Sequence, residues 1–330
     1  MFAEAIEDIL ENQCTPAEVR AIEAGGSPAA LWQTLADTGF LELLASEADG
    51  GAALSLPELF PILSSFGRYA VPVPLAQTIV ARALLGSKQA IPAAMITFAA
   101  TLHREADGAI ACPLTPFGKV ADFVLARDAD DALLLPAVSA QRQSTGVSRS
   151  LTATLTWPNE RGATRVPSGG TALTAFAAAL HAALLSGAMT RVFEMTLQHC
   201  NNRHQFGKSL GKFQAVQHQL SVMAEHTASA SIAAEAAFRT VDTVPALRSA
   251  AIAKSRTSEA AQLVASIAHA LHGAIGITEE YDLQLLTRRL HEWRMAHGSE
   301  AHWNLRIGQD VLFGDMSLVE FVRSVSPYER

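Results

Sequence analysis

The amino-acid sequence predicts a mainly α-helical protein with a small β domain in the middle of the chain. Apolar residues recur at helical spacing over about the first 90 residues and again from Thr171 onward. The stretch between them holds short apolar and β-branched runs separated by Asp, Gly, Pro and Ser, which is the pattern of strands and turns. We therefore expect an N-terminal helical domain (1–92), a small β domain (93–168) and a C-terminal antiparallel four-helix bundle (169–330).

The N-terminal domain contains five segments with helical spacing. Ser27 can cap the third of them, with Pro28 at its first helical position. Asp49-Gly50-Gly51 interrupts the pattern before the fourth. The expected helices are Phe2–Glu11, Pro16–Ala24, a helix from Pro28 through Phe40, Leu56–Phe66 and Pro74–Leu85.

The middle region is expected to form strands. It is only about 75 residues long, so these strands can build no more than a small sheet or barrel. The expected strands lie in Met95–Thr101, Ala109–Pro113, Ala121–Leu125, Ala132–Leu135 and Leu151–Trp157.

Four long helices are predicted from Thr171 onward, at about 171–201, 211–241, 245–272 and 279–313. Gly207 and Gly211 separate the first two, and Gly273 to Gly276 separates the last two. Thr278 is a suitable cap for the fourth helix. Because the connections are short, neighbouring helices should be antiparallel.

Composition and charge exclude several classes of protein. The net charge of −7, without a run of Lys and Arg, argues against a general nucleic-acid binder. No CxxC or His/Cys cluster indicates a metal site, and three scattered cysteines fit a reducing compartment. The apolar tract Leu173–Met189 contains His181 and many alanines, so we expect a buried helix rather than a membrane span. With no signal peptide at its N-terminus, the protein is expected to be cytoplasmic.

Two motifs in the C-terminal region and a weaker match near the N-terminus resemble the acyl-CoA dehydrogenase family. The first motif is Arg203-His204-Gln205-Phe206-Gly207 followed by Phe213-Gln214, similar to the family's Arg-x-Gln/Thr-Phe-Gly segment and the Phe/His-Gln pair after it. The second, His272–Tyr281, is similar to the family's glycine turn before the last helix of the bundle. The weaker match runs from Leu31 to Pro74.

This resemblance implies binding of FAD by residues that serve the flavin of a neighbouring subunit, and hence an oligomer. An arginine fork suits the anionic pyrophosphate, phenylalanines can pack on the adenosine, and glycines let the backbone approach phosphate at a helix start. The implied cofactor-binding residues are Arg203, Gln205, Phe206, Leu210, Phe213, Gln214, Val216, Gly273 and Gly276.

The carboxylate base that the family uses to remove an α-proton is missing at both places where it is expected. The position after the glycine turn holds His297, and the alternative position on the first bundle helix is near Ala177. Three explanations stay open. The chain is the non-catalytic half of a heteromer, or His297 is itself the base, or the chain is a flavin monooxygenase of the same fold, which needs no carboxylate base.

Other flavin contacts of the family are also thinned. Its Thr-Glu-Pro stretch and its aromatic-Ile-Thr-Asn strand have no counterpart in the β domain, and Ala270 and Ala301 replace common polar residues. The resemblance therefore implies a subunit that completes the flavin site of a paralogous partner, with acyl-CoA as substrate and an electron-transferring flavoprotein as electron acceptor. A bulky acyl chain, such as a steroid side chain, is expected. The alternative outside enzymology is a purely structural subunit. A di-iron bundle is excluded because the chain lacks Glu-x-x-His.

Overall fold

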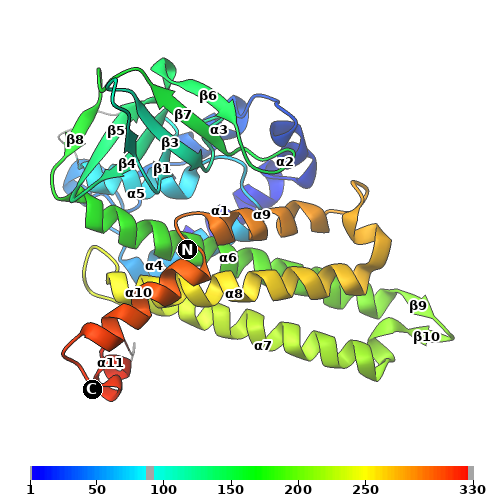
Figure 1. The fold of residues 1–330 in the computed structure, drawn as a ribbon. Coiled ribbons are helices and arrows are strands. Elements are labelled where there is room, and N and C mark those ends of the chain that lie inside the picture. Colours follow the sequence, from blue (N-terminus) through cyan, green and yellow to red (C-terminus); the bar gives the residue numbers. More distant parts are fainter. Residues whose placement is uncertain (1, 87–92, 326–330) are drawn as a thin grey trace.

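The computed structural model describes residues 2–86 and 93–325. Along the chain, a group of helices is followed by a β region and then by a second group of helices (Figure 1). The first part of the chain is helical, as expected. Its helices are α1 (Phe2–Gln13), α2 (Pro16–Glu23), α3 (Ala29–Asp37), α4 (Leu56–Arg68) and α5 (Leu75–Leu85).

Local caps explain where these helices begin. The hydroxyl of Thr15 accepts the amide of Glu18 at the start of α2. At α4, Ser55 and Glu58 form a capping box. The helix expected from Pro28 through Phe40 is wrong only in its last three residues, because α3 ends at Asp37 and the chain turns at Gly39, where φ is +79°.

The β region forms two four-stranded sheets with the orders β1-β4-β5-β8 and β2-β3-β7-β6. The sheet alternative is therefore right, and the described strands form no closed barrel. The short strands β2, β6 and β8 are not in the expected set, because their largely exposed residues lack an apolar pattern. The strands are β1 (Ile96–Ala99), β2 (His103–Arg104), β3 (Ile110–Thr115), β4 (Phe123–Asp128), β5 (Asp131–Pro136), β6 (Gln141–Ser144), β7 (Ala153–Trp157) and β8 (Thr164–Val166).

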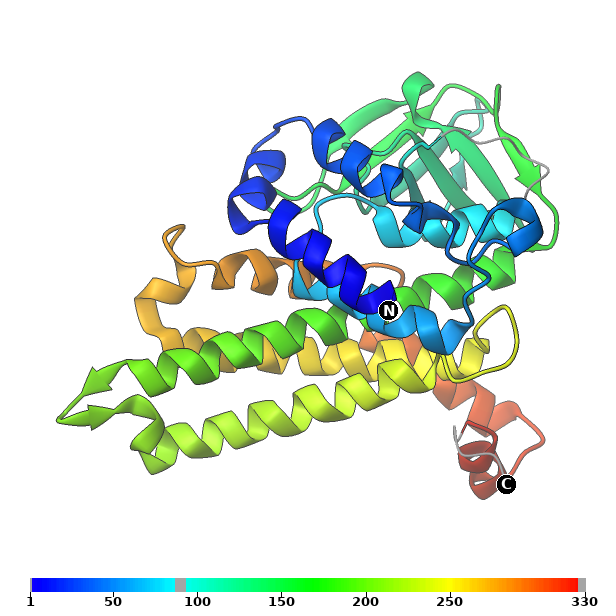
Figure 2. The same ribbon diagram turned by 180° about the vertical axis from the view of Figure 1, so that it is seen from behind.

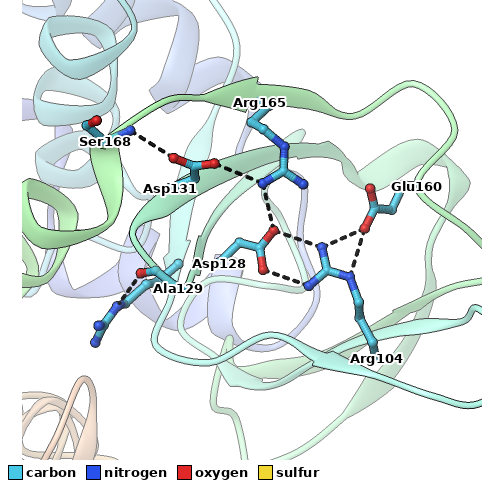
Figure 3. Close-up of polar contacts among 8 residues, drawn as sticks. Arg104, Asp128, Ala129, Asp131, Glu160, Arg165 and Ser168 are labelled. Atoms are coloured by element: carbon cyan, nitrogen blue, oxygen red, sulfur yellow. Dashed lines mark hydrogen bonds and ion pairs between the residues drawn. The ribbon is translucent and has the colours of Figure 1, made fainter.

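An ion-pair network ties the β region together next to the start of the first long helix (Figure 3). Arg104 forms two hydrogen bonds to Asp128, of 2.6 and 2.8 Å, and also pairs with Glu160. Arg165 contacts both Asp128 and Asp131. These two arginines thus pair with all three carboxylates at this edge.

The C-terminal region contains long helices joined at one end by a small hairpin (Figures 1 and 2). The hairpin strands β9 (His204–Gln205) and β10 (Lys208–Ser209) project from the end that lies away from the β region. The helices are α6 (Gly169–Asn202), α7 (Gln214–Ala236), α8 (Leu247–His272), α9 (Leu283–Met295), α10 (Glu300–Phe313) and α11 (Leu318–Ser324).

The single helix expected at 279–313 is wrong, because two helices, α9 and α10, occupy it. The chain breaks between Met295 and Glu300, where His297 and Gly298 have φ values of +54° and +97°. The cap expected at Thr278 is also wrong, because Asp282 precedes α9 and the Thr278 hydroxyl donates back to Ile275.

Helix α6 is the central core helix. It packs against α4, α7, α8 and α9, and its most apolar stretch is 89% buried inside the protein. Both α6 and the segment Leu247–Ile277 are long and apolar enough to pass a length test for a membrane span, which core helices also pass. The burial of α6 accounts for its composition as a core helix, in agreement with the expectation for Leu173–Met189.

Candidate functional site

Seven of the nine predicted cofactor-binding residues, from Arg203 to Val216, lie in the turn between α6 and α7 and at the start of α7. The backbone amide of Leu210 donates to the carbonyl of Arg203 over 2.8 Å and closes this turn. Phe206, 91% exposed at the hairpin tip, packs edge-on against Phe213 with a centroid distance of 6.3 Å. Gln214 begins α7, and among the described residues no side chain caps this helix. The turn therefore presents a guanidinium, two aromatic rings and free helix amides to the outside.

Gly273 and Gly276 lie at the same end of the molecule as the hairpin, in the short 3-10 helix between α8 and α9 (Figures 1 and 2). Stacked imidazole rings connect the end of α6 to the end of α8, because the ring centroids of His199 and His272 lie 4.3 Å apart. Gly273 has a φ of +65°, and a Cβ on Gly276 would lie 3.0 Å from the Cβ of His272. Both positions therefore favour glycine.

His297 lies away from these residues, in the break between α9 and α10. Its ring contacts the ring of His181 on α6 at a centroid distance of 4.8 Å, and the Nε2 atoms of both rings are buried without a hydrogen-bond partner among the described residues. The Nδ1 atom of His181 lies 2.7 Å from the carbonyl of Ala177. The structure thus brings together the two positions, Ala177 and His297, where the resemblance places a base.

The environment of His297 makes it a weak base. Burial, and then the charge of Lys254, lower the pKa of its imidazole to about 3. Burial also holds the pKa of His181 well below its usual range, assisted by His297 and Lys254. At neutral pH both rings are uncharged, and a base with so low a pKa has little driving force to take a proton.

Lys254 on α8 holds the break between α9 and α10 in place. It is fully buried, and its Nζ donates hydrogen bonds of 2.8 Å to the Ser258 hydroxyl and to the carbonyls of Arg294 and Gly298. Burial lowers the pKa of Lys254 to about 7. Three acceptors match the three donors of the charged ammonium, whereas a neutral amine has only two. Lys254 and His181 are absent from the expected site residues, because neither stands in a recognisable motif.

Two cavities open beside His297. The larger, about 470 Å³, lies between the β region and the segment from Arg289 to Gly298, with Phe117 and Trp293 among its walls. The smaller, about 270 Å³, lies between the end of β4, the start of α6 and α10, and Ala177 and His297 both line it. Among the described residues that line the smaller cavity, none carries a carboxylate.

Comparison with protein families decides the identity of the fold. Residues 1–90 match the profile "Acyl-CoA dehydrogenase, N-terminal domain", and residues 171–312 match "Acyl-CoA dehydrogenase, C-terminal domain". Acyl-CoA dehydrogenase IpdE2 of Mycolicibacterium smegmatis is 31% identical over 303 residues, covering 88% of this chain and 91% of that protein. The chain belongs to the acyl-CoA dehydrogenase family.

Solved structures agree with this family fold. The ChsE4–ChsE5 complex from Mycobacterium tuberculosis contains a chain that matches with a TM-score of 0.83 at 19% identity. The match covers 96% of this chain and 96% of that chain. The Tcur3481–Tcur3483 steroid ACAD, a G363A variant, has a TM-score of 0.80 at 23% identity, with 93% of this chain and 95% of that chain covered. Each of these two structures is named for two different chains.

Membership of this family implies a flavin cofactor, and the residues of the α6–α7 turn are chemically suited to it. Within the described residues Arg203 forms no ion pair, so its guanidinium can meet a diphosphate. The uncapped start of α7 offers backbone amides and the positive end of a helix dipole. Gly276 leaves room that a side chain would fill. The donor set therefore suits an anionic dinucleotide.

Proposed function

We propose that this chain is a subunit of an FAD-dependent acyl-CoA dehydrogenase that introduces an α,β double bond into a CoA thioester. In this assembly it completes the flavin site of a paralogous partner subunit, and the partner supplies the carboxylate base. Electrons then pass from the flavin to an electron-transferring flavoprotein.

The observation that carries this proposal is the smaller cavity beside His297. Both positions expected for a base line this cavity, yet one is Ala177 and the other is a buried imidazole whose pKa is lowered to about 3. A family member that works alone needs an ionised carboxylate against the α-carbon. The exposed residues of the α6–α7 turn, in contrast, keep the features expected of a dinucleotide site, which favours half of an active site over a complete one.

A bulky acyl chain is the proposed substrate, with a steroid side chain as the leading candidate. The support is the structural neighbour Tcur3481–Tcur3483, a steroid ACAD named for two different chains.

Flavin stoichiometry tests the assembly. We expect the chain alone to hold little flavin, and the chain purified with its paralogous partner to hold flavin and to oxidise acyl-CoA. Arg203→Ala should release flavin from this complex because it removes the fork that faces the diphosphate. Arg161→Ala, at an exposed arginine of the β region, is the matched control and should keep flavin. Full flavin occupancy and turnover by the lone chain would overturn the proposal, and flavin retention in the Arg203 variant would favour a structural subunit.

His297→Asn tests who supplies the base. Asparagine tolerates the positive φ of this position, so the loop should keep its shape. We expect the complex to lose less than about tenfold in turnover, since removing a true general base costs about 10²–10⁴-fold. A loss in that larger range would make His297 the base.

A further inference from the structure

Two arginines line the smaller cavity beside His297 and give it a positive charge. Arg127, at the end of β4, and Arg306, on α10, both line it, together with His302. Within the described parts of the chain no residue that lines this cavity is acidic, although the whole chain has a net charge of −7. A concentration of cations in a cavity of an acidic protein attracts a specific anion.

Nearby carboxylates do not neutralise these arginines. Asp128 follows Arg127 directly in the chain, but Arg104 and Arg165 already engage it, as Figure 3 shows. Asp131 is likewise paired with Arg165. The Nε of Arg127 donates to the carbonyl of Ala129 over 3.0 Å, which orients the guanidinium without cancelling its charge.

The same holds on α10. Glu300 at its start is paired with Arg294, with Nε and Oε2 3.0 Å apart. Across residues 2–86 and 93–325, neither Arg127 nor Arg306 forms an ion pair with a carboxylate. The effect reaches His302, whose pKa is lowered first by burial and then by Arg306 and Lys254.

The walls of the cavity add to this positive charge beside His297. Leu173 and Thr174, within the first two turns of α6, form one wall, so the positive end of that helix dipole adds to the field. Trp303 is almost fully buried on another wall, and its indole N–H is already bonded to the His297 carbonyl over 3.1 Å. The guanidiniums remain as donors without a charged partner.

We propose that Arg127 and Arg306 form an anion-binding subsite that holds a carboxylate or phosphate group of the substrate beside His297. For a CoA thioester the anion is either a phosphate of the coenzyme or a carboxylate at the far end of the acyl chain. The assignment to a CoA thioester rests on the proposed function, whereas the anion site itself needs neither flavin nor the partner.

Calorimetric titration of the full chain tests the subsite with three probes: pentanoyl-CoA, glutaryl-CoA, which adds a terminal carboxylate at the same chain length, and pentanoyl-dephospho-CoA, which lacks the 3′-phosphate. Arg127→Gln and Arg306→Gln should each weaken binding of at least one probe about tenfold, as loss of a charge-assisted hydrogen bond implies. Arg161→Gln removes an exposed positive charge elsewhere and should leave all three affinities unchanged.

The pattern identifies the source of the anion. If glutaryl-CoA binds more tightly than pentanoyl-CoA and only this gain is lost in the variants, the subsite takes the acyl carboxylate. If pentanoyl-dephospho-CoA binds about tenfold more weakly than pentanoyl-CoA and is insensitive to the variants, the subsite takes the 3′-phosphate. If the variants weaken all three probes alike, the subsite takes the diphosphate. Arg127→Lys and Arg306→Lys keep the charge and should restore part of the affinity, which separates a binding role from a folding defect. Unchanged affinities in both Gln variants would overturn the subsite and would leave the proposed flavin role standing.

Discussion

The ammonium group of Lys254 donates a hydrogen bond to the carbonyl oxygen of Gly298 over 2.8 Å, and so links the middle of α8 to the break between α9 and α10. A second bond of the same length reaches the carbonyl of Arg294, on the other side of His297. One buried side chain therefore clamps both ends of the loop that carries the candidate residue.

Replacing Lys254 with methionine should loosen this loop. The change keeps the length of the side chain but leaves the Gly298 carbonyl without its Lys254 donor, and leaves the Arg294 carbonyl with only the Ser258 hydroxyl 3.4 Å away. An unmet buried carbonyl costs about 1–3 kcal/mol. The variant also removes a buried charge, and the desolvation cost that this avoids offsets part of the loss in global stability. We therefore expect the main effect in the loop itself. We expect amide hydrogen exchange at 296–299 to accelerate by roughly 5- to 150-fold. Lys212→Met, at an exposed lysine, is the control, and unchanged exchange in the Lys254 variant would contradict the clamp.

Acid should destabilise the fold through His297. Its pKa in the folded protein, about 3, lies below the value of about 6.5 in an unfolded chain, so the unfolded chain binds the proton more tightly. This contribution to stability is present above pH 6.5 and is lost as pH falls from about 6.5 to about 3. At pH 5 the loss is about 2 kcal/mol.

Urea unfolding at pH 7 and pH 5 measures this effect. The stability difference between the two pH values should be about 2 kcal/mol smaller in His297→Asn than in the native chain. His103→Asn, which changes an exposed histidine, should leave the difference as it is. An identical pH dependence in the His297 variant would show that its imidazole titrates normally.

The ion pair between Glu23 on α2 and Arg289 on α9 should be essential for docking the N-terminal helices on the C-terminal region. The two charged groups lie 2.8 Å apart, and their side chains are only 2% and 3% exposed. Glu23→Gln leaves Arg289 with only Glu292, 3.1 Å away, and also removes the carboxylate that pairs with Arg288, so we expect a loss of about 3–5 kcal/mol in unfolding free energy. Glu235→Gln breaks the exposed pair with Arg239 and should cost less than about 0.5 kcal/mol. A loss below 1 kcal/mol in the Glu23 variant would contradict this role.

Much of the fold is predictable because its signals are local. Ser55 and Glu58 sit three residues apart, so the start of α4 can be inferred from the sequence before any contact is known. The break at His297 is different, because contacts from Lys254 and Trp303 hold its backbone in place. A local signal was nevertheless available, since Gly298 and Ser299 are typical of a helix end followed by a new helix start.

The candidate site also contains residues that a local motif predicts and residues that only tertiary contacts reveal. The residues from Arg203 to Val216 lie in one contiguous motif, so a resemblance can find them, although their flavin role remains a prediction. Lys254, more than 40 residues before His297, carries no motif, and its role depends on the tertiary packing of α8 beside the loop. The anion subsite likewise depends on a fold that brings β4 beside α10.

The crossing of α4 and α6 should depend on two glycines. A Cβ built on Gly187 would lie 1.8 Å from the carbonyl oxygen of Ser64, and one on Gly67 would lie 2.0 Å from that of Leu184. Backbone atoms cannot yield as side chains do, so Gly187→Ala must push the two helices apart. Overpacking usually costs about 1–3 kcal/mol, and we expect the upper end or more here. Gly308→Ala, inside α10 with nothing within 4 Å, should instead stabilise the chain by about 0.5–1 kcal/mol. Chemical denaturation of both variants checks the contrast, and a Gly187 variant as stable as the native chain would mean that the helices can separate without loss of packing.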